Sequence, residues 1–567
     1  MSILPFPLFP AYSAPSSPPS PIEEVLSDDY LLSLVLRSLT RDSFHYALVS
    51  KRWYAAARLS LAHLTIKSKI RFSVLVDAIR GFSSLTHLEL QYHRVTDGQT
   101  DPNGDALYQC LGATCPNLTH LTIHYQLDMQ VTCNGLSTLF HGCRKLRHLR
   151  LLTLRALPHL PPNVTLLSDL RTLHLCRHTR FYGEDHLENL IAPPESVAAL
   201  QRLQELRVAA GSAFQGLPDS IGSLTNLQSL TFANPSLSDL PTSIGRLPHL
   251  QTLGIEMERL EWIPDSFQHL TRLRSLSLHS KCLTRVPEHV MGAMLRLKAL
   301  SLSCPEIDSL PDNLGALVQL ETLKLQDLPY LRCLPESMGE LQRLRSLEIN
   351  QVGMRQLPES LCTGSARHSL EKLYLRECRE LKQLPPQLPM LTRLQDLEIT
   401  FCRSVESLDP LFAPDPALSS QHDEEQRSAQ QPWGLASLTS LSLCRCWQIT
   451  SLPDSLSTLS ALSSLTLTHM HGLSSLPESL GQLKNLRVLK LQHMDKLSVL
   501  PESLGQLKHL ETLELYYLPE LNSLPGSLRR LPKLKEPLLI EVGRVTEWWW
   551  IDYLPSVRSA RMRLMIH

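Results

Sequence analysis

The tetrad Leu-Pro-x-Ser recurs along this chain with small variations, and the strand pattern Leu-x-x-Leu-x-Leu follows each copy. Clear copies begin at Leu217, Leu240, Leu310, Leu476 and Leu500. From Leu217 to Leu357, the leading residues of successive copies are 23 or 24 positions apart. Repetition at such a period specifies a solenoid, because a single repeat cannot bury its own leucines and must stack on its neighbours.

The repeat pattern also predicts the local structure. The leucines of Leu-x-x-Leu-x-Leu point inward, and the x residues face outward along short parallel strands about 4.8 Å apart. The proline suits the first turn of a short helix or 3₁₀ segment, and we expect glycines such as Gly245 and Gly315 to mark the return turn. The pattern resembles the leucine-rich-repeat family. The predicted fold is an α/β leucine-rich-repeat solenoid, a horseshoe with a parallel concave sheet, running from Leu85 to Leu510 with a degenerate copy at Leu534.

Composition excludes several classes of partner. Lys plus Arg and Asp plus Glu both total 55 of 567 residues, so the net charge of zero predicts neither nucleic acid nor an acidic membrane as partner. No apolar run approaches the length of about 18 residues that a spanning helix needs. The 13 cysteines are odd in number and favour free thiols in a reducing compartment, cytoplasmic or nuclear. Residues 1–22 are interrupted by prolines and predict a disordered leader rather than a signal peptide.

Residues 23–62 predict a small helical domain ahead of the repeats. Ser27, followed by Asp28 and Asp29, starts a helix, and apolar side chains then recur at helical spacing. The segment resembles an F-box, since the string Val49-Ser-Lys-Arg-Trp53 and an aliphatic helix fall in register with that family's pattern. A helical cap that shields the first repeat is the alternative.

The resemblance implies that the F-box docks the Skp-type linker protein and, through it, the cullin of an SCF ubiquitin ligase. Ser27 replaces the proline that usually follows the first leucine, which implies weaker docking. The residues that the resemblance assigns to linker binding are Leu26, Asp29, Leu32, Leu39, Val49 and Trp53.

The repeats change character along the chain. Residues 63–210 resemble the cysteine-containing repeats of F-box/leucine-rich-repeat proteins, whereas residues 211–535 resemble plant intracellular Ras-group and disease-resistance repeats. Cys378, Cys402 and Cys446 share one repeat position, where later copies carry Met or Leu. We therefore interpret these cysteines as packing residues, and we expect neither a metal site nor a cofactor.

Two columns of outward-facing residues form a candidate binding surface at the ends of the C-terminal strands. Stacking the repeats by register gives an aromatic and basic ridge, which would contact the target, such as an acidic or phosphorylated segment. A surface filled by neutral drift is the alternative. The predicted substrate-binding residues are Arg376, Phe401, Arg445, His469, His493, Tyr516 and Tyr517.

Two irregular pieces complete the chain. The insert at 409–435 is polar and punctuated by prolines, which predicts a mobile loop that could serve as a lid, a regulatory site or neither. Residues 536–567 contain three consecutive tryptophans from Trp548 and predict a C-terminal cap, with a partner-binding or membrane-surface motif as the alternative.

Three function classes follow. The chain contains no nucleotide-binding loop, kinase set or nucleophile elbow, so we do not expect an enzyme. A substrate receptor of an SCF ligase is the leading hypothesis, and a ligase-independent scaffold or immune-type recognition module is the alternative. A small-molecule sensor is a variant of the first that needs clustered inward-facing basic residues, and Arg147, Arg150 and Arg171 are too few.

Overall fold

The computed structural model describes residues 62–68, 76, 79–80, 82–93, 104–126, 131–152, 160–176, 195–209, 216–412, 434–534 and 536–542. The leader, residues 23–61 of the predicted F-box, the tryptophan-rich tail and residues 413–433 of the insert lie outside these ranges. The chain divides into two compact units, Met1–Ala213 and Phe214–His567.

Unit 1 is built from parallel strands with helices on the connections. Each strand pairs in register with the next one in the chain. The strands are β1 His63–Ser68, β2 His87–His93, β3 His120–Gln126, β4 His148–Leu152, β5 Thr172–Cys176 and β6 Glu205–Ala209. The connections contain α6 Asp105–Thr114, α7 Cys133–Gly142, and the 3₁₀ segments η1 Pro162–Leu166 and η2 Glu195–Ala199.

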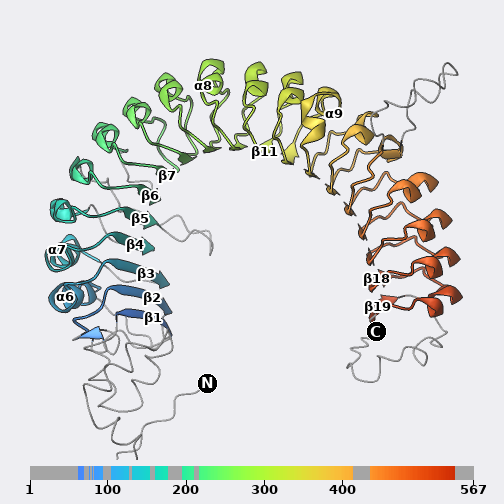
Figure 1. Cartoon of the computed structure of the whole chain (residues 1–567), viewed down its shortest axis with the longest axis horizontal. Coiled ribbons are helices and arrows are strands. Elements are labelled where there is room, and N and C mark those ends of the chain that lie inside the picture. Colours follow the sequence, from blue (N-terminus) through green and yellow to red (C-terminus); the bar gives the residue numbers. More distant parts are fainter. Residues whose placement is uncertain are drawn as a thin grey trace, which may run out of the picture. The chain divides into compact units, whose positions relative to one another are not determined.

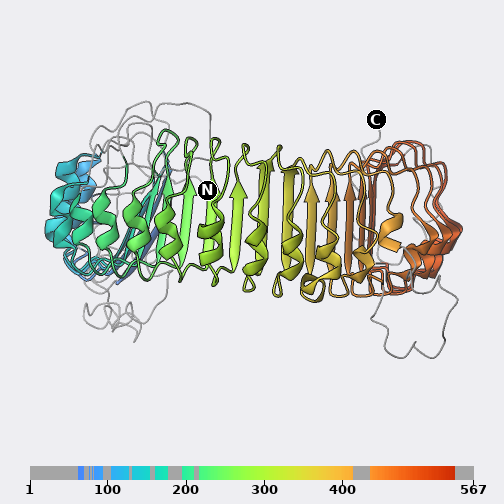
Figure 2. The same ribbon diagram turned by 90° about the horizontal axis from the view of Figure 1, so that it is seen from above.

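Unit 2 continues the same design with shorter outer segments. Its strands line the inner side of an arc, and the helical turns lie on the outer side (Figure 1). The strands lie side by side and point the same way (Figure 2). They are β7 Ser229–Ala233, β8 Thr252–Glu256, β9 Ser275–His279, β10 Ala299–Ser303, β11 Thr322–Leu328, β12 Ser346–Val352, β13 Lys372–Arg376, β14 Asp396–Thr400, β15 Ser440–Cys444, β16 Ser464–Thr468, β17 Val488–Gln492, β18 Thr512–Leu518 and β19 Glu536–Val542.

The outer segments of unit 2 are mostly single 3₁₀ turns. They are η3 Asp219–Ser223, η4 Thr242–Arg246, η5 Asp265–His269, α8 Glu288–Ala293, η6 Asp312–Ala316, η7 Glu336–Glu340, α9 Ser360–Thr363, η8 Ser365–His368, η9 Leu388–Met390, η10 Asp409–Phe412, η13 Asp454–Thr458, η14 Glu478–Gln482, η15 Glu502–Gln506 and η16 Gly526–Arg530. A 3₁₀ helix is narrower than an α-helix and occurs in short segments. It therefore suits the outer side of a repeat of only 23 or 24 residues.

Leucine burial explains why these strands form. In β13, Leu373 and Leu375 are fully buried, and their partners in β14, Leu397 and Ile399, lie directly beside them. The same columns run through every described repeat, so each repeat covers the apolar edge of the one before it. The predicted fold class, a leucine-rich-repeat solenoid with a parallel inner sheet, is therefore confirmed in each unit.

The prolines lie one position earlier than predicted. Pro241, with φ −64° and ψ 131°, is the residue before η4, and Pro311 stands in the same place before η6. Their extended ψ turns the chain into the 3₁₀ segment, which begins at the following residue. Proline has no N–H, and an N–H at this position would find no acceptor within the 3₁₀ turn.

The glycines of the repeat serve close packing, which differs from the predicted role in turning. Among the glycines that the structure describes, only Gly216 and Gly434 have positive φ, and neither occupies the repeat position of Gly315. A Cβ on Gly315 would instead collide with the carbonyl oxygen of Ser337 in the next repeat. Glycine is needed here because two backbones approach closely.

The shared cysteine position is confirmed as a packing position. Cys378, Cys402 and Cys446 are fully buried, as are Met470 and Met494 at the same register. Burial raises the pKa of Cys446 to about 12, with Cys402 adding to the effect, so its thiol stays protonated. The cysteines that the structure describes are free thiols.

Candidate functional site

The structure brings the first predicted column together. Strand pairing from β13 to β18 aligns the fifth residue of each strand, from Arg376 to Tyr516. The intervening members of this column are Thr400, Cys444, Thr468 and Gln492. All of them face away from the leucine core and are partly exposed.

The second column comes one residue after the first in each repeat and has an unusual backbone. Its members all have φ between 50° and 56°, although none of them is glycine. Left-handed conformation is uncommon for a residue with a side chain and costs roughly 1–2 kcal/mol. The column consists of Asp327, Gln351, Glu377, Phe401, Arg445, His469, His493 and Tyr517. We call it the left-handed column.

One extra residue per repeat creates this column. In the earlier repeat of β7, the strand ends at Ala233 and the buried Asn234 follows at once. In the later repeats, one residue stands between the strand and the buried position, for example His469 before Met470. The backbone N–H of His469 donates to the carbonyl of Gln492 at 2.8 Å, so the next strand holds the extra residue in place.

The left-handed column places its side chains one above another. The rings of His469 and His493 stack with centroids 4.2 Å apart and planes 6° apart. Tyr517 continues the stack at 5.3 Å from His493, and Tyr516 of the first column meets the same ring edge-on at 4.9 Å. The predicted ridge residues from His469 to Tyr517 are therefore one continuous aromatic surface.

Two arginines lie on aromatic rings at the start of this surface. Arg445 lies over Phe401 at 4.4 Å, and Arg403 lies over Trp447 at 4.2 Å. The two pairs cross between neighbouring repeats, because each arginine lies on a ring from the other repeat. Stacking on a ring keeps a guanidinium charged and fixed in orientation.

A further row was missed by the sequence interpretation. It lies two residues after the left-handed column and contains Arg403, Trp447, His471 and Asp495. His471 and Asp495 form an ion pair at 2.7 Å, and Trp447 packs near His471 at 6.1 Å. The constant offset of two residues could have identified this row in the sequence. The positive φ of the left-handed column, which brings both rows to one surface, could not be predicted in this way.

Arg376 differs from the other predicted cations. Its Nε and Nη2 donate to the two carboxylate oxygens of Glu398 at 2.7 and 2.5 Å. The Arg376 guanidinium, through these hydrogen bonds, lowers the pKa of the Glu398 carboxyl. A bidentate pair of this kind neutralises the charge, so Arg376 lies in the predicted column with its guanidinium already occupied.

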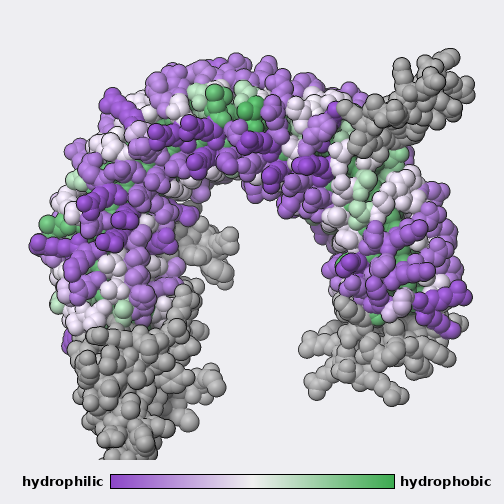
Figure 3. Space-filling model, in the orientation of Figure 1, coloured by the Kyte–Doolittle hydropathy of each residue, from purple (hydrophilic) through white to green (hydrophobic). Residues whose placement is uncertain are grey.

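The ridge owes its positive charge to its arginines rather than to His469. Burial, His493 and Arg445 lower the pKa of His469, so this ring is neutral at pH 7. In the space-filling view, hydrophilic side chains cover most of the visible face of unit 2, and less polar ones interrupt them near its C-terminal end (Figure 3).

The cost of the left-handed column can be measured at Gln351, whose side chain donates to Glu377 at 3.0 Å. We expect Gln351→Val to be less stable than Gln351→Gly by about 1–2 kcal/mol, because only glycine adopts positive φ without strain. Both variants lose the same side-chain hydrogen bond, so urea unfolding of the pair isolates the backbone term. Equal midpoints would contradict the left-handed assignment.

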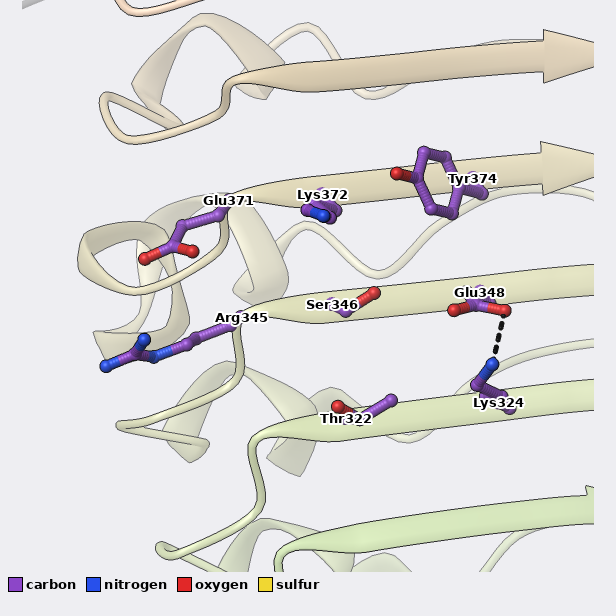
Figure 4. Close-up of a pocket in the computed structure, with 8 residues that line it drawn as sticks. All are labelled: Thr322, Lys324, Arg345, Ser346, Glu348, Glu371, Lys372 and Tyr374. Atoms are coloured by element: carbon purple, nitrogen blue, oxygen red, sulfur yellow. Dashed lines mark ion pairs between the residues drawn. The ribbon is translucent and has the colours of Figure 1, made fainter. Parts of the chain in front are cut away.

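A hollow of about 430 Å³ lies on the strands before the ridge. Thr322, Lys324, Ser346, Glu348, Lys372 and Tyr374 line its strands, and Arg345 and Glu371 stand where β12 and β13 begin (Figure 4). Lys324 and Glu348 pair at 3.0 Å across it. Cations and carboxylates alternate here, so the hollow presents no single charge to a ligand.

Unit 1 carries a separate cluster of imidazoles. His63, His87, His120 and His148 occupy the same strand position in β1 to β4. The rings of His87, His120 and His148 stack at 3.9 and 4.2 Å, and His63 meets His87 edge-on at 4.0 Å. We call this set the histidine stack. Sequence analysis did not identify it, although a histidine opens each of these strands.

The basic residues considered for a small-molecule site lie at β4 and β5, where the backbone N–H of Arg171 donates to the carbonyl of Arg147 at 2.7 Å. Arg147 and Arg171 precede β4 and β5, and Arg150 approaches Glu205 at 4.0 Å. No group of three or more His, Cys, Asp or Glu side chains is arranged to hold a metal ion in the part of the chain that the structure describes. Within the same part, no helix has the length and apolarity needed to cross a bilayer.

Known proteins share the repeat architecture. Residues 220–409 match the family model of a leucine-rich repeat region. A leucine-rich-repeat protein of Leptospira interrogans is 26% identical, with a TM-score of 0.57 over 75% of this chain and 98% of that chain. Toll, from the Toll–Spatzle complex of Drosophila, shares the fold at 16% identity and a TM-score of 0.50, over 81% of this chain and 57% of its own. No curated protein matches the chain by sequence.

Proposed function

We propose that this chain is a non-catalytic substrate receptor of an SCF-type ubiquitin ligase, in which the ridge binds the target. The observation that carries the recognition role is the run of stacked rings and ring-bound arginines from Phe401 to Tyr517. The matched family describes a repeat region rather than an enzyme.

The exposure of the ridge supports binding. Trp447 and Tyr517 are 41% and 42% exposed, although both are large rings beside other rings. Tyr, Trp and Arg are the side chains that most often anchor protein interfaces. Fixed rings and guanidiniums also lose little conformational freedom when a partner binds. The ridge is therefore preorganised for an interface.

Ligase docking is assigned to residues 23–62, on the pattern from Leu26 to Trp53. In this proposal the F-box binds the Skp-type linker, the linker binds the cullin, and ubiquitin transfer takes place on other subunits. The repeats then need only to hold the target, which agrees with a chain in which sequence motifs for catalysis are missing.

The docking role predicts loss of linker capture in a triple variant. We expect the full chain to retain the Skp-type linker and cullin in a pulldown, and Leu26→Ala, Leu32→Ala and Trp53→Ala together to reduce capture by at least about tenfold, because apolar anchors dominate interface energy. Phe401→Ala is the control, since it lies on the ridge and leaves residues 23–62 unchanged.

Failure of the wild-type chain to capture the linker would remove the ligase role. A ligase-independent recognition scaffold is the second candidate, and Ser27 in place of the usual proline favours it. In that case residues 23–62 would cap the first repeat, and the triple variant would lose stability without any change in linker binding.

A further inference from the structure

The ridge changes in character from one repeat to the next, and this change identifies its ligand more closely. At the end nearest β14 and β15 lie Arg403 and Arg445, each stacked on a ring. Among the residues that the structure describes, neither guanidinium pairs with a carboxylate. Towards β18 the surface becomes aromatic, with His469, His493 and Tyr517 in contact.

The two arginines differ from other arginines at comparable positions. Arg376 is bound by both oxygens of Glu398, and Arg379, two residues after the left-handed Glu377, approaches that carboxylate at 3.6 Å. Arg403 and Arg445 have rings where those arginines have carboxylates. A ring orients a guanidinium without neutralising it, so the hydrogen-bonding edge stays available for an oxyanion.

The far end of the ridge is unsuited to an anion. Asp495 places a carboxylate there, 2.7 Å from Nδ1 of His471, and the pKa of His469 is lowered by burial and by neighbouring positive groups. A ligand that is acidic along its whole length would meet Asp495 unfavourably. An apolar or aromatic side chain fits the stacked rings there instead.

The length of the ridge sets the length of the ligand. Four strand-to-strand steps separate β14 from β18, which is about 19 Å at about 4.8 Å per step. An extended peptide rises about 3.3 Å per residue, so about six residues span the ridge.

We propose that the ridge binds an extended segment of about six residues in a target protein. Its carboxylate side chains contact Arg403 and Arg445, and an aromatic or apolar side chain at the other end packs on His469, His493 and Tyr517. This inference rests on the proposed recognition function of the ridge, and it does not depend on docking of the Skp-type linker.

A hexapeptide array tests the proposal with the full chain. One pool carries Asp or Glu at three adjacent positions and Trp, Tyr or Phe near the other end, and a matched pool replaces each acid by its amide. We expect the acidic pool to bind at least about tenfold more tightly than the amide pool, with affinity falling as salt rises. Equal binding of the two pools, or binding of neither, would overturn the proposal.

Variants locate the binding. We expect Arg403→Gln with Arg445→Gln to remove the preference for acidic peptides, and Arg403→Lys with Arg445→Lys to restore part of it. Arg379→Gln is the matched control and should change nothing, because Arg379 already faces Glu377. A loss as large in Arg379→Gln as in the double variant would show a general charge effect and would refute the assigned site.

Two further arms separate the possible failures. A third pool carries phosphoserine in place of the acids, and binding of this pool alone would overturn the carboxylate assignment. Linker capture is measured on the same preparations. Peptide binding without linker capture would remove the ligase role and leave this inference standing, whereas linker capture without peptide binding would do the reverse.

Discussion

Gly315→Ala is expected to lower the free energy of unfolding of unit 2 by about 1–3 kcal/mol, the usual cost of forcing an extra methyl group into a packed core. The new Cβ would collide with the carbonyl oxygen of Ser337, which lies on η7 of the next repeat. The Gly315 N–H also donates to the Ser337 hydroxyl at 3.2 Å, so a shift that relieves the collision would lengthen this bond.

Gly526→Ala is the matched control, because no atom lies within 4 Å of a Cβ at Gly526. Its N–H donates to Glu502 and would continue to do so in alanine. We expect Gly526→Ala to be neutral or stabilising by about 0.4–1 kcal/mol, since alanine has less freedom to lose on folding. Urea unfolding of both variants, followed by circular dichroism, gives the comparison. An equal effect of the two substitutions would refute the close-approach explanation.

The repeat itself explains why a single methyl group matters. In a solenoid each repeat contacts only its neighbours, so a wider gap at one interface is not compensated elsewhere. Ser457 occupies the equivalent position in the repeat that begins at Leu452. A shift therefore accommodates a Cβ at that interface, which is why we expect a cost of a few kcal/mol at Gly315 rather than loss of the fold.

The repeat period predicted most of the described architecture, because leucines at fixed spacing admit few arrangements. Strand positions, inward leucines such as Leu373 and the alignment of Arg376 with Tyr516 all follow from the register. The backbone within one repeat was predicted less well. Gly315 was assigned to a turn, because a sequence does not show that another backbone lies against that residue.

The candidate site was predicted in outline and missed in its contacts. The column from Phe401 to Tyr517 could be aligned by counting residues. Its positive φ could not be predicted, since Phe, Arg and Tyr rarely adopt that conformation. Whether an arginine is free or neutralised also depends on geometry between repeats. Arg376 and Arg445 lie in adjacent columns of the same predicted ridge, yet one pairs with Glu398 and the other lies on Phe401.

The histidine stack in unit 1 has fixed hydrogen positions. The hydroxyl of Thr86 donates its only hydrogen to the carbonyl of Ala62 at 3.0 Å, so it must accept from Nδ1 of His87 at 2.8 Å. Thr119 does the same for His120 at 2.9 Å. In both rings Nε2 is therefore the nitrogen that gains a proton when the pH falls.

Burial and neighbouring basic side chains disfavour protonation of the histidine stack. Burial lowers the pKa of His87 to about 4, with His120 and His63 acting in the same direction. Burial, His148 and His63 lower the pKa of His120, and Arg147 and Arg150 add to this. For His148, burial, Arg150 and Arg171 lower the pKa while Glu205 opposes them. Glu89 lies two residues after His87 on β2.

Unit 1 is therefore expected to lose stability as the pH falls from about 6.5 towards 4, because these lowered pKa values mean that the folded stack binds fewer protons than the unfolded chain. The rings are only half-buried and remain partly screened by solvent, so we expect an effect on the order of tenfold in the folding equilibrium. Hydrogen exchange at pH 7 and pH 5, corrected for the intrinsic rate, should show β2 and β3 losing protection while β11 and β12, which contain no histidine, keep theirs. His87→Phe with His120→Phe keeps flat rings in the stack but cannot be protonated, so it should flatten this pH dependence, whereas His269→Gln, exposed in η5, should leave it intact. If the double variant kept the wild-type pH dependence, the acid sensitivity would arise outside the histidine stack.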